Sequence, residues 1–495
     1  MKTRRRVLFV IACFFFVCTN LSAQEEKKTG REYKPREQKL YIDIPLAFGE
    51  VMTINLIGNA YWRLWGPDSE AAYFTPDSMR NNLNPRVWEF EMGQVGDTFL
   101  VNQFLHPYAG ANYFASARSN NINFFWSMLF SAFGSLSWEA LGETDTPAIS
   151  DAINTTFGGI AMGEMLHRLY IELDKGGTAG KIISSIVSPP DRLTALIRGY
   201  GPEEGQSKIR GSSFAFGFSW INAKFFDGKD EITSWNTPAA FINFDIVYDN
   251  PYTEHGYTPF AQFDLNTSLT VSVQPFYNLT IIADGYLASW LLADNETAQA
   301  SNGVTLHFDD FITDKGFMDL NNGRENLSFY AQSLDYSVKW LRHDSSIFNK
   351  AFDFSLKTHL GFSPWAITDY NGGEINPNTG EKDDYNLYLW GGNFKLFMEF
   401  REMNEDGGVK NGHVLAFSLC FYDAWNIPKT PGFDVNAIFL FSKLAYSFPL
   451  TEKLSLYAAD SFMLLYCRLT RDAGAEFPDI TRWYNSAQLG LKISF

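Results

Sequence analysis

Cysteine is scarce in this sequence, and its scarcity excludes two kinds of site. Only four cysteines occur in 495 residues, and Cys13 and Cys18 fall in an N-terminal segment that we expect to be removed. The remaining two, Cys420 and Cys467, are too few for a disulfide framework, and neither lies in a Cys-x-x-Cys or Cys/His cluster. We therefore expect no disulfide scaffold, no structural zinc and no cofactor.

Basic residues and long apolar runs are also in short supply. Lysine and arginine number 40 against 56 aspartates and glutamates, which gives a formal net charge of −16. No block of basic residues follows the first few positions, so we expect no nucleic-acid partner. The stretch from Ile122 to Trp138 carries no charge, but its serines make it a marginal membrane span, and a buried helix is the favoured interpretation.

The N-terminus has the three parts of a secretory leader. A basic start, Lys2 to Arg6, precedes the apolar stretch Val7 to Val17, which is too short to span a bilayer as a helix. Leu21 to Ala23 then offers small residues to a signal peptidase. We predict a signal peptide over residues 1–23, a polar linker over residues 24–40, and export of the mature chain.

The C-terminus shows strict alternation. In SAQLGLKISF, apolar residues at every second position place one apolar and one polar face on a strand: Leu489, Leu491, Ile493 and Phe495. A chain that finishes on an aromatic residue in this pattern resembles the C-terminal signal of Gram-negative outer-membrane barrels. The alternative is an ordinary sheet strand at a chain end. Together with the leader, the pattern predicts location in the cell outer membrane.

The same alternation recurs through the second half of the chain. Its apolar faces are rich in aromatic residues, and no helical pattern of useful length interrupts it, so lipid is the expected cover for these faces. A soluble β-sandwich would alternate too, but without these two features. We predict a transmembrane antiparallel β-barrel of about twelve strands over residues 202–495. The polar segments 370–384 and 471–479 are predicted to be surface loops.

The inward face of the predicted barrel carries charges of both signs. Because charges away from water must pair, mixed signs on neighbouring strands favour a lumen packed by ion pairs. The alternative is a substrate channel that these side chains line. The predicted lumen residues are Asp335, Lys339, Asp353, Lys357, His359, Lys395, Glu399 and Arg401.

Between residues 41 and 201 the apolar period becomes helical, and we predict an α+β membrane protein whose N-terminal domain has about four or five helices. Pro107 suits the first turn of a helix and places His106 at its start. Ser150 is a suitable N-cap, with Asp151 at the positive end of the helix dipole. One helix carries polar residues four apart: Asn55, Asn59 and Arg63.

Four motifs of this region occur in the order of a known family. NQFLHPYAGANYFASARS, GSLSWEALGE, SDAINTTFGG and MGEMLHRL resemble an uncharacterised envelope family catalogued as domain of unknown function 3943. The resemblance covers roughly Val51 to Gly201, and Asn121 departs from it because the family usually has glycine there. A more distant likeness links His106, the glutamates after it, and Asp151 and Asn154 to VanZ-like membrane families. Neither resemblance implies a reaction.

The helical segments hold the residues from which a site could be built. In one hypothesis His106 is a general base, Glu139 or Glu143 orients it, and Ser119 or Ser135 is the nucleophile. In the other, favoured hypothesis these side chains are part of a hydrogen-bonded polar seam between helices. The seam would include Tyr108, Tyr113, Arg118, Asp151, Asn154 and Glu164.

A metal site at His106 is a weaker third alternative, because the region has no His-Glu-x-x-His motif and only His167 as a second histidine.

Two classes of function follow from this organisation. The first is a non-enzymatic outer-membrane barrel, structural or transport-related, whose helical domain plugs the lumen or contacts the periplasm. The second is an envelope enzyme acting on a lipid or glycan head group at the His106 site. The expected partners are outer-membrane lipid and, during biogenesis, the barrel-assembly machinery. An open porin would leave the helical domain without a role.

Overall fold

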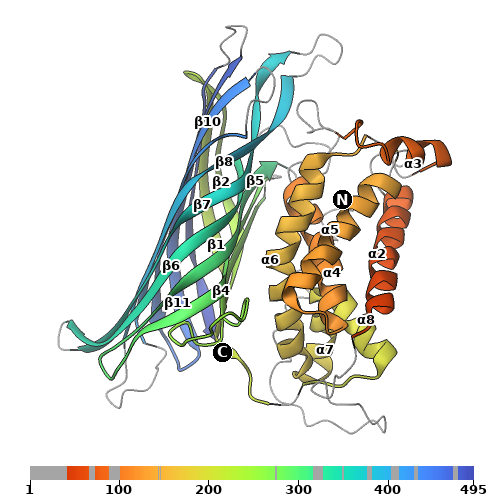
Figure 1. Cartoon of the computed structure of the whole chain (residues 1–495). Coiled ribbons are helices and arrows are strands. Elements are labelled where there is room, and N and C mark those ends of the chain that lie inside the picture. The colour runs from red at the N-terminus through yellow and green to blue at the C-terminus, as the bar shows by residue number, and fades with distance from the viewer. Residues whose placement is uncertain are drawn as a thin grey trace. The chain divides into compact units, whose positions relative to one another are not determined.

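The structure is a computed structural model with two compact units, a helical one and a β-barrel (Figure 1). It describes residues 42–65, 73–88, 101–142, 144, 146–203, 205–273, 276–315, 327–347, 350–375, 382–402, 412–427, 433–471 and 478–495. The expected signal peptide and linker, residues 1–23 and 24–40, lie outside the described residues, as does the candidate Glu143.

The helical unit contains seven α-helices within the described residues. They are α2 (Ile44–Trp65), α3 (Pro76–Asn82), α4 (His106–Ser119), α5 (Phe124–Leu141), α6 (Ile149–Asp174), α7 (Gly177–Val187) and α8 (Pro189–Arg198), and a π-helical turn, η2 (Val101–Leu105), precedes α4. The count exceeds the expected four or five because short helices end at local breaks, such as Gly176 between α6 and α7. No described helix is long and apolar enough to cross a membrane.

Helix α4 packs against α2, α5, α6 and α8. Its closest approach is to α6, where a Cβ atom built on Gly110 would lie 1.8 Å from the Thr155 carbonyl oxygen. The reverse holds for Gly159, whose Cβ would lie 2.4 Å from the Gly110 carbonyl carbon. Only glycine permits this backbone contact, which explains the small residues of the α4 motif.

The second unit is a closed barrel of twelve antiparallel strands, in which β1 pairs with both β2 and β12. The prediction of a barrel of about twelve strands after a helical domain is confirmed. The strands are β1 (Ile209–Asp227), β2 (Asp230–Tyr248), β3 (Phe263–Ser272), β4 (Phe276–Asp294), β5 (Ala298–Lys315), β6 (Leu327–Ile347), β7 (Lys350–Ile375), β8 (Lys382–Glu402), β9 (Val414–Asn426), β10 (Phe433–Pro449), β11 (Leu454–Arg471) and β12 (Ile480–Ser494).

One expected loop is shorter than predicted. The Asn, Gly and Pro content of residues 370–384 predicts a loop, but β7 continues to Ile375 and β8 begins at Lys382. Pairing between β7 and β8 therefore overrides the local turn signals.

The outer wall of the barrel exposes large apolar side chains. Phe218 is 82 % exposed, Leu360 67 % and Leu489 57 %, and each lies on the apolar face that the alternation predicts. A soluble protein rarely exposes a continuous apolar surface of this kind, whereas a barrel in a membrane presents such a band to lipid. The closed sheet leaves no unpaired edge, as a bilayer requires.

Beyond Trp220 the two faces of β1 exchange their chemistry, so that apolar residues point inward and polar residues point outward. Ile221, Ala223 and Phe225 point into the barrel and are fully buried, whereas Asn222 on the outer face is exposed. The inward apolar residues join a core cluster with side chains from across the barrel, including Phe439. An apolar interior with a polar exterior is the pattern of a water-soluble β-structure. The outer face of β1 at Asn222 and Lys224 therefore suits water, beyond the lipid-facing band.

Candidate functional site

The structure places His106 at the start of α4 and turns its ring toward α6. Its Nδ1 lies 3.1 Å from Thr155 Oγ1, and its Nε2 lies 3.8 Å from Asp151 Oδ2. Glu139, the carboxylate expected to orient His106, instead accepts the backbone N–H of Ala148 at 3.0 Å, just before α6. Asp151 is therefore the carboxylate beside this histidine. Asp151 lies in the first turn of α6, where the helix dipole favours a negative charge.

The two candidate nucleophiles are bonded elsewhere. Ser119 Oγ donates to the Ser116 carbonyl at 3.0 Å and lies 2.8 Å from Thr194 Oγ1. Ser135 Oγ of α5 donates to the Ala152 carbonyl of α6 at 3.4 Å. Both serines are buried, and within the described part of the chain neither hydroxyl is bonded to an imidazole. An activated serine would need such a base, so these contacts favour a structural role.

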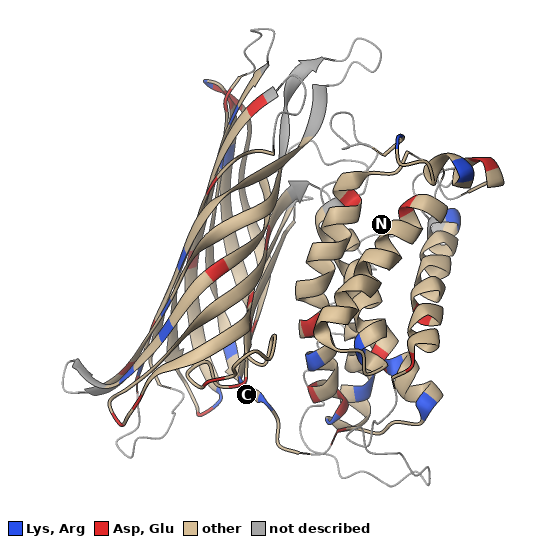
Figure 2. Cartoon of the chain, in the orientation of Figure 1, with Lys and Arg blue, Asp and Glu red and all other residues tan. Residues whose placement is uncertain are grey.

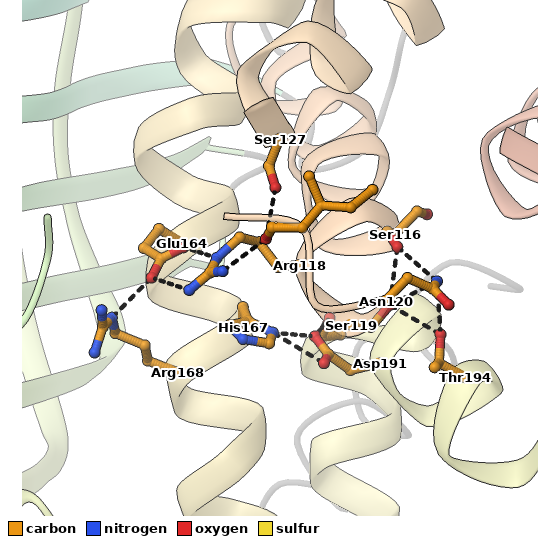
Figure 3. A network of polar contacts seen from close by, with 12 residues as sticks. Ser116, Arg118, Ser119, Asn120, Ser127, Glu164, His167, Arg168, Asp191 and Thr194 are labelled. Atoms are coloured by element: carbon orange, nitrogen blue, oxygen red, sulfur yellow. Dashed lines mark hydrogen bonds and ion pairs between the residues drawn. The ribbon is translucent and has the colours of Figure 1, made fainter. Parts of the chain in front are cut away.

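Arg118 forms a bidentate ion pair with Glu164 between α4 and α6 (Figure 3). Its Nε and Nη2 donate to the two carboxylate oxygens at 2.6 and 3.1 Å, and Nη1 donates to the Ile122 carbonyl at 2.8 Å. Arg168, one turn further along α6, donates to Glu164 at 2.9 Å. Burial alone would raise the pKa of Glu164, but the two arginines overcome it and lower the pKa, so this carboxylate stays ionised.

A second cluster joins α2, α4 and α8 around Glu50, a residue that the sequence patterns did not predict. Glu50 is buried, accepts Thr194 Oγ1 at 2.7 Å on Oε1, and accepts Asn120 Nδ2 at 2.9 Å on Oε2. Asn120 also donates to the Ser116 carbonyl at 2.8 Å, as Figure 3 shows. Burial, reinforced by the charge of Asp191, raises the pKa of Glu50 to about 8 despite these hydrogen bonds. The sequence offered one signal for this site: Glu50 is the single acidic residue of α2.

His167 is a buried hydrogen-bonding residue and not the ordinary amphipathic position that its sequence context suggested. Its Nδ1 lies 2.9 and 3.0 Å from the two carboxylate oxygens of Asp191, and Ser188 Oγ donates to Asp191 at 2.8 Å. Burial lowers the pKa of His167 although Asp191 opposes this, so the ring is neutral near pH 7.

Two tyrosines of the predicted seam extend these contacts. Tyr113 donates to the side chain of Asn55 on α2, and Asn55 in turn donates to Ser137 Oγ of α5 at 2.8 Å. Tyr108 donates to the Ile186 carbonyl of α7 at 3.3 Å, and burial raises the pKa of its phenol. Asn154 is buried in α6. Polar side chains thus link α2 with α4 and α5, and α4 with α6, α7 and α8.

Figure 2 shows charged residues of both signs toward the two ends of the helical bundle, with long uncharged stretches along the helices between them. The Arg118–Glu164 pair and the Glu50 cluster are both built on the C-terminal part of α4, close to α8. Together these two clusters fix the packing of α2, α6 and α8 around α4.

The barrel lumen holds a separate layer of paired charges. Lys339 Nζ lies 3.0 Å from Asp264 and 2.9 Å from Asp284, and Lys395 Nζ lies 2.8 Å from Asp309 and 3.0 Å from Asp335. The alternation in the sequence predicts both lysines and Asp335 as lumen residues. The other three aspartates were not predicted, although their alternating positions on β3, β4 and β5 mark them as inward-facing.

The other predicted lumen residues have partners too. Lys357 lies 2.6 Å from Asp264, and Arg401 Nη2 lies 2.9 Å from Glu399. Asp353 lies 3.1 Å from His343 Nδ1. His359 Nδ1 lies 2.6 Å from Ser337 Oγ and 3.1 Å from His307 Nε2. Of these contacts, the one between Lys357 of β7 and Asp264 of β3 joins strands that lie far apart in the sequence.

A cavity of about 670 Å³ occupies the lumen toward the end where β1 begins and β12 finishes. Its wall contains many serine hydroxyls, among them Ser355, Ser418 and Ser461, together with charges of both signs, including Lys357 and Glu399. The volume falls within the usual range for small-molecule sites. At its inner boundary Phe441 and Met463 belong both to the cavity wall and to the apolar core.

The fold and the lumen define a class: a transmembrane β-barrel of the outer-membrane type, with a helical unit ahead of it. Residues 94–189 match the model of a family described as "Domain of unknown function (DUF3943)". No curated protein matches the chain.

Among solved structures, the chain is similar to the beta domain of the Bordetella autotransporter Brka at 11 % identity and a TM-score of 0.23, covering 58 % of this chain and 99 % of that one. It is also similar to the COG4313 outer-membrane channel from Pseudomonas putida F1, at 11 % identity and a TM-score of 0.26, covering 59 % and 97 %. At these values the likenesses say nothing about what this chain does.

Proposed function

We propose that this protein is a transport-related outer-membrane barrel whose lumen binds a small polar solute from the end that carries the barrel termini. One observation carries the proposal: the lumen is layered along its axis. A cavity of about 670 Å³ whose wall includes serine and charged side chains lies at one end, and a core of buried apolar side chains fills the other. An open porin would need a continuous water-filled lumen, which this apolar core interrupts.

The chemistry of the wall indicates which solutes fit. Serine hydroxyls both donate and accept hydrogen bonds. Six basic and six acidic side chains line the wall, and some of them are paired, as Arg401 is with Glu399. Such a wall has no surplus charge of one sign with which to select an ion. It suits an uncharged or zwitterionic polar solute, and it suits a strongly anionic or cationic one poorly.

The location in the cell envelope follows from the same architecture. The exposed aromatic band suits contact with outer-membrane lipid, and the alternating C-terminal strand suits recognition by the barrel-assembly machinery. The leader expected over residues 1–23 would direct export. The end carrying the barrel termini would then face the periplasm, and the apolar end the exterior.

For the helical unit we propose an interaction or structural role. The buried polar groups around Glu164, Glu50 and Asp191 are bonded to one another and to backbone, as a polar seam requires. Enzymatic action on a lipid or glycan head group stays as the second candidate, because His106 is partly exposed and lies beside Thr155 and Asp151. The distant VanZ-like likeness concerns the same residues.

Calorimetric titration of the full-length protein in detergent micelles tests the proposed solute site. The probes are a neutral saccharide, a zwitterionic amino acid and a dicarboxylate. Ser418→Trp would fill the cavity, since Ser418 lines it, and Leu415→Trp is the matched control on the outer face of the same strand, β9. We expect saturable binding of a neutral or zwitterionic probe that Ser418→Trp abolishes and Leu415→Trp preserves. Binding of the dicarboxylate alone, or none at all, would refute the proposal.

A further inference from the structure

Two histidines and an aspartate meet inside the barrel. Asp284 of β4 and His307 of β5 are directly opposite each other in the strand register, and His359 reaches them from β7. All three are buried, and one ligand atom from each lies within 4.8 Å of the others. The imidazole planes of the histidines are nearly perpendicular, at 89°, with His307 Nε2 3.1 Å from His359 Nδ1.

Each histidine keeps one ring nitrogen without a hydrogen-bond partner among the described residues: Nδ1 of His307 and Nε2 of His359. Both side chains are fully buried, so water does not solvate these nitrogens freely. A buried polar atom left unpaired destabilises the fold, which a bound ligand would relieve. Lys339 bonds Oδ2 of Asp284, which leaves the other carboxylate oxygen for a ligand. Each of the three side chains therefore has a nitrogen or oxygen atom, unbonded among the described residues, that can donate a lone pair to a metal ion.

We propose that Asp284, His307 and His359 form a binding site for a divalent transition-metal ion such as Zn²⁺. Imidazole with a single carboxylate suits zinc, nickel or copper, whereas magnesium and calcium prefer oxygen ligands. Three protein ligands leave one position of a tetrahedral zinc ion open. Asp284 also lines the cavity, so one of the three ligands borders the lumen. The inference is independent of the proposed solute binding.

Nearby lysines do not make the cluster cationic. Four buried carboxylates, those of Asp264, Asp284, Asp309 and Asp335, face the ammonium groups of Lys339, Lys357 and Lys395. One negative charge is therefore left over before any metal binds. Lys339 also keeps Asp264 as a second partner, so Asp284 can serve a metal ion without leaving this lysine unpaired.

Metal titration of the full-length protein tests this site. The protein is purified in detergent micelles, stripped with a chelator, and titrated with Zn²⁺ by calorimetry and with Co²⁺ by visible absorption, which reports tetrahedral coordination. The variants are His307→Gln and His359→Gln. The control is His413→Gln, because His413 lies beside Tyr446, outside the cluster. Heat-modifiable gel migration shows that each variant is folded.

We expect the wild type and His413→Gln to bind one Zn²⁺ and to give the tetrahedral Co²⁺ spectrum. Loss of either cluster histidine should weaken binding by about 100-fold or more, since even second-sphere changes cost 10–100-fold. Asp284→Asn gives the same test if a glutamine variant does not fold. Folded wild-type protein without saturable Zn²⁺ binding would overturn the proposal, as would cluster variants that bind as tightly as the wild type.

Discussion

Phe329 of β6 and Phe439 of β10 stack face to face inside the barrel, with ring centroids 4.6 Å apart and ring planes within 3°. The two strands are not neighbours in the sheet, so the contact crosses the lumen. Phe311 adds a further ring, 4.7 Å from Phe439. These rings are part of the core that separates the cavity from the opposite end of the barrel.

The stacked pair gives the first prediction. Phe329→Ser combined with Phe439→Ser should raise the single-channel conductance of the protein in planar lipid bilayers, because hydroxyls in the vacated space can hold water where an apolar cavity would stay dry. The control is Phe218→Ser, on the lipid-facing wall. Unchanged conductance in a folded double variant would show that another part of the molecule closes the lumen.

The glycine contact between α4 and α6 gives the second prediction. Gly110→Ala should destabilise the helical unit by about 3 kcal/mol or more, at the upper end of overpacking costs, because the clash is with backbone. Gly49→Ala is the matched control: its Cβ would meet nothing within 4 Å, and it should stabilise α2 by about 0.5–1 kcal/mol. Denaturant titration followed by helical circular dichroism measures both. Equal effects of the two substitutions would contradict the close crossing.

The raised pKa of Glu50 gives the third prediction. This carboxyl has an ordinary pKa of 4.5 and a pKa of about 8 in the folded protein. Between these values the folded state holds a proton that the unfolded state has lost, so the contribution of Glu50 to stability falls as the pH rises, by up to about 1.4 kcal/mol per pH unit. Glu50→Gln should remove this dependence and protect the helical unit more than wild type at pH 8.

Hydrogen exchange of peptides from α2, α4 and α8, followed by mass spectrometry from pH 5 to pH 9, measures the effect of Glu50 in the full-length protein. The comparison is made at each pH between wild type and Glu50→Gln, so that the intrinsic pH dependence of exchange cancels. A constant difference across this range would mean that Glu50 does not change its protonation on unfolding.

The polarity reversal of β1 gives the fourth prediction. Spin labels attached at Phe218→Cys and Asn222→Cys lie on the same outer face of the strand, four residues apart. In liposomes the first label should be relaxed mainly by oxygen dissolved in lipid, and the second mainly by a water-soluble nickel chelate. The native Cys420 and Cys467 are replaced by alanine. Two labels in the same environment would contradict a membrane boundary between these positions.

Sequence patterns predicted the barrel well because its signals are local. The alternation that ends at Phe495 needs only neighbouring residues to be recognised, and the structure places that strand, β12, against β1 to close the barrel. Local signals failed at residues 370–384, where turn-forming residues lie within two paired strands. There the pairing partner, and not the local sequence, decides the structure.

The sites were harder to predict because they depend on contacts between distant segments. Asp264 and Lys339 are 75 residues apart, and only the barrel register brings them to 3.0 Å. His106 was correctly singled out as a histidine at a helix start, but its neighbour Asp151 depends on how α4 crosses α6. Glu50 was missed because the burial that raises its pKa comes from α4 and α8, not from its own helix.

The central claim is that the lumen is open to water at one end and closed by apolar side chains at the other. Cysteine accessibility tests it most directly, with Cys420 and Cys467 replaced by alanine and a charged methanethiosulfonate reagent applied to the protein in detergent micelles. Ser418→Cys lies in the cavity wall, and Ala437→Cys lies in the apolar core. We predict rapid modification at residue 418 and protection at residue 437. Equally rapid modification at both positions would contradict a closed lumen.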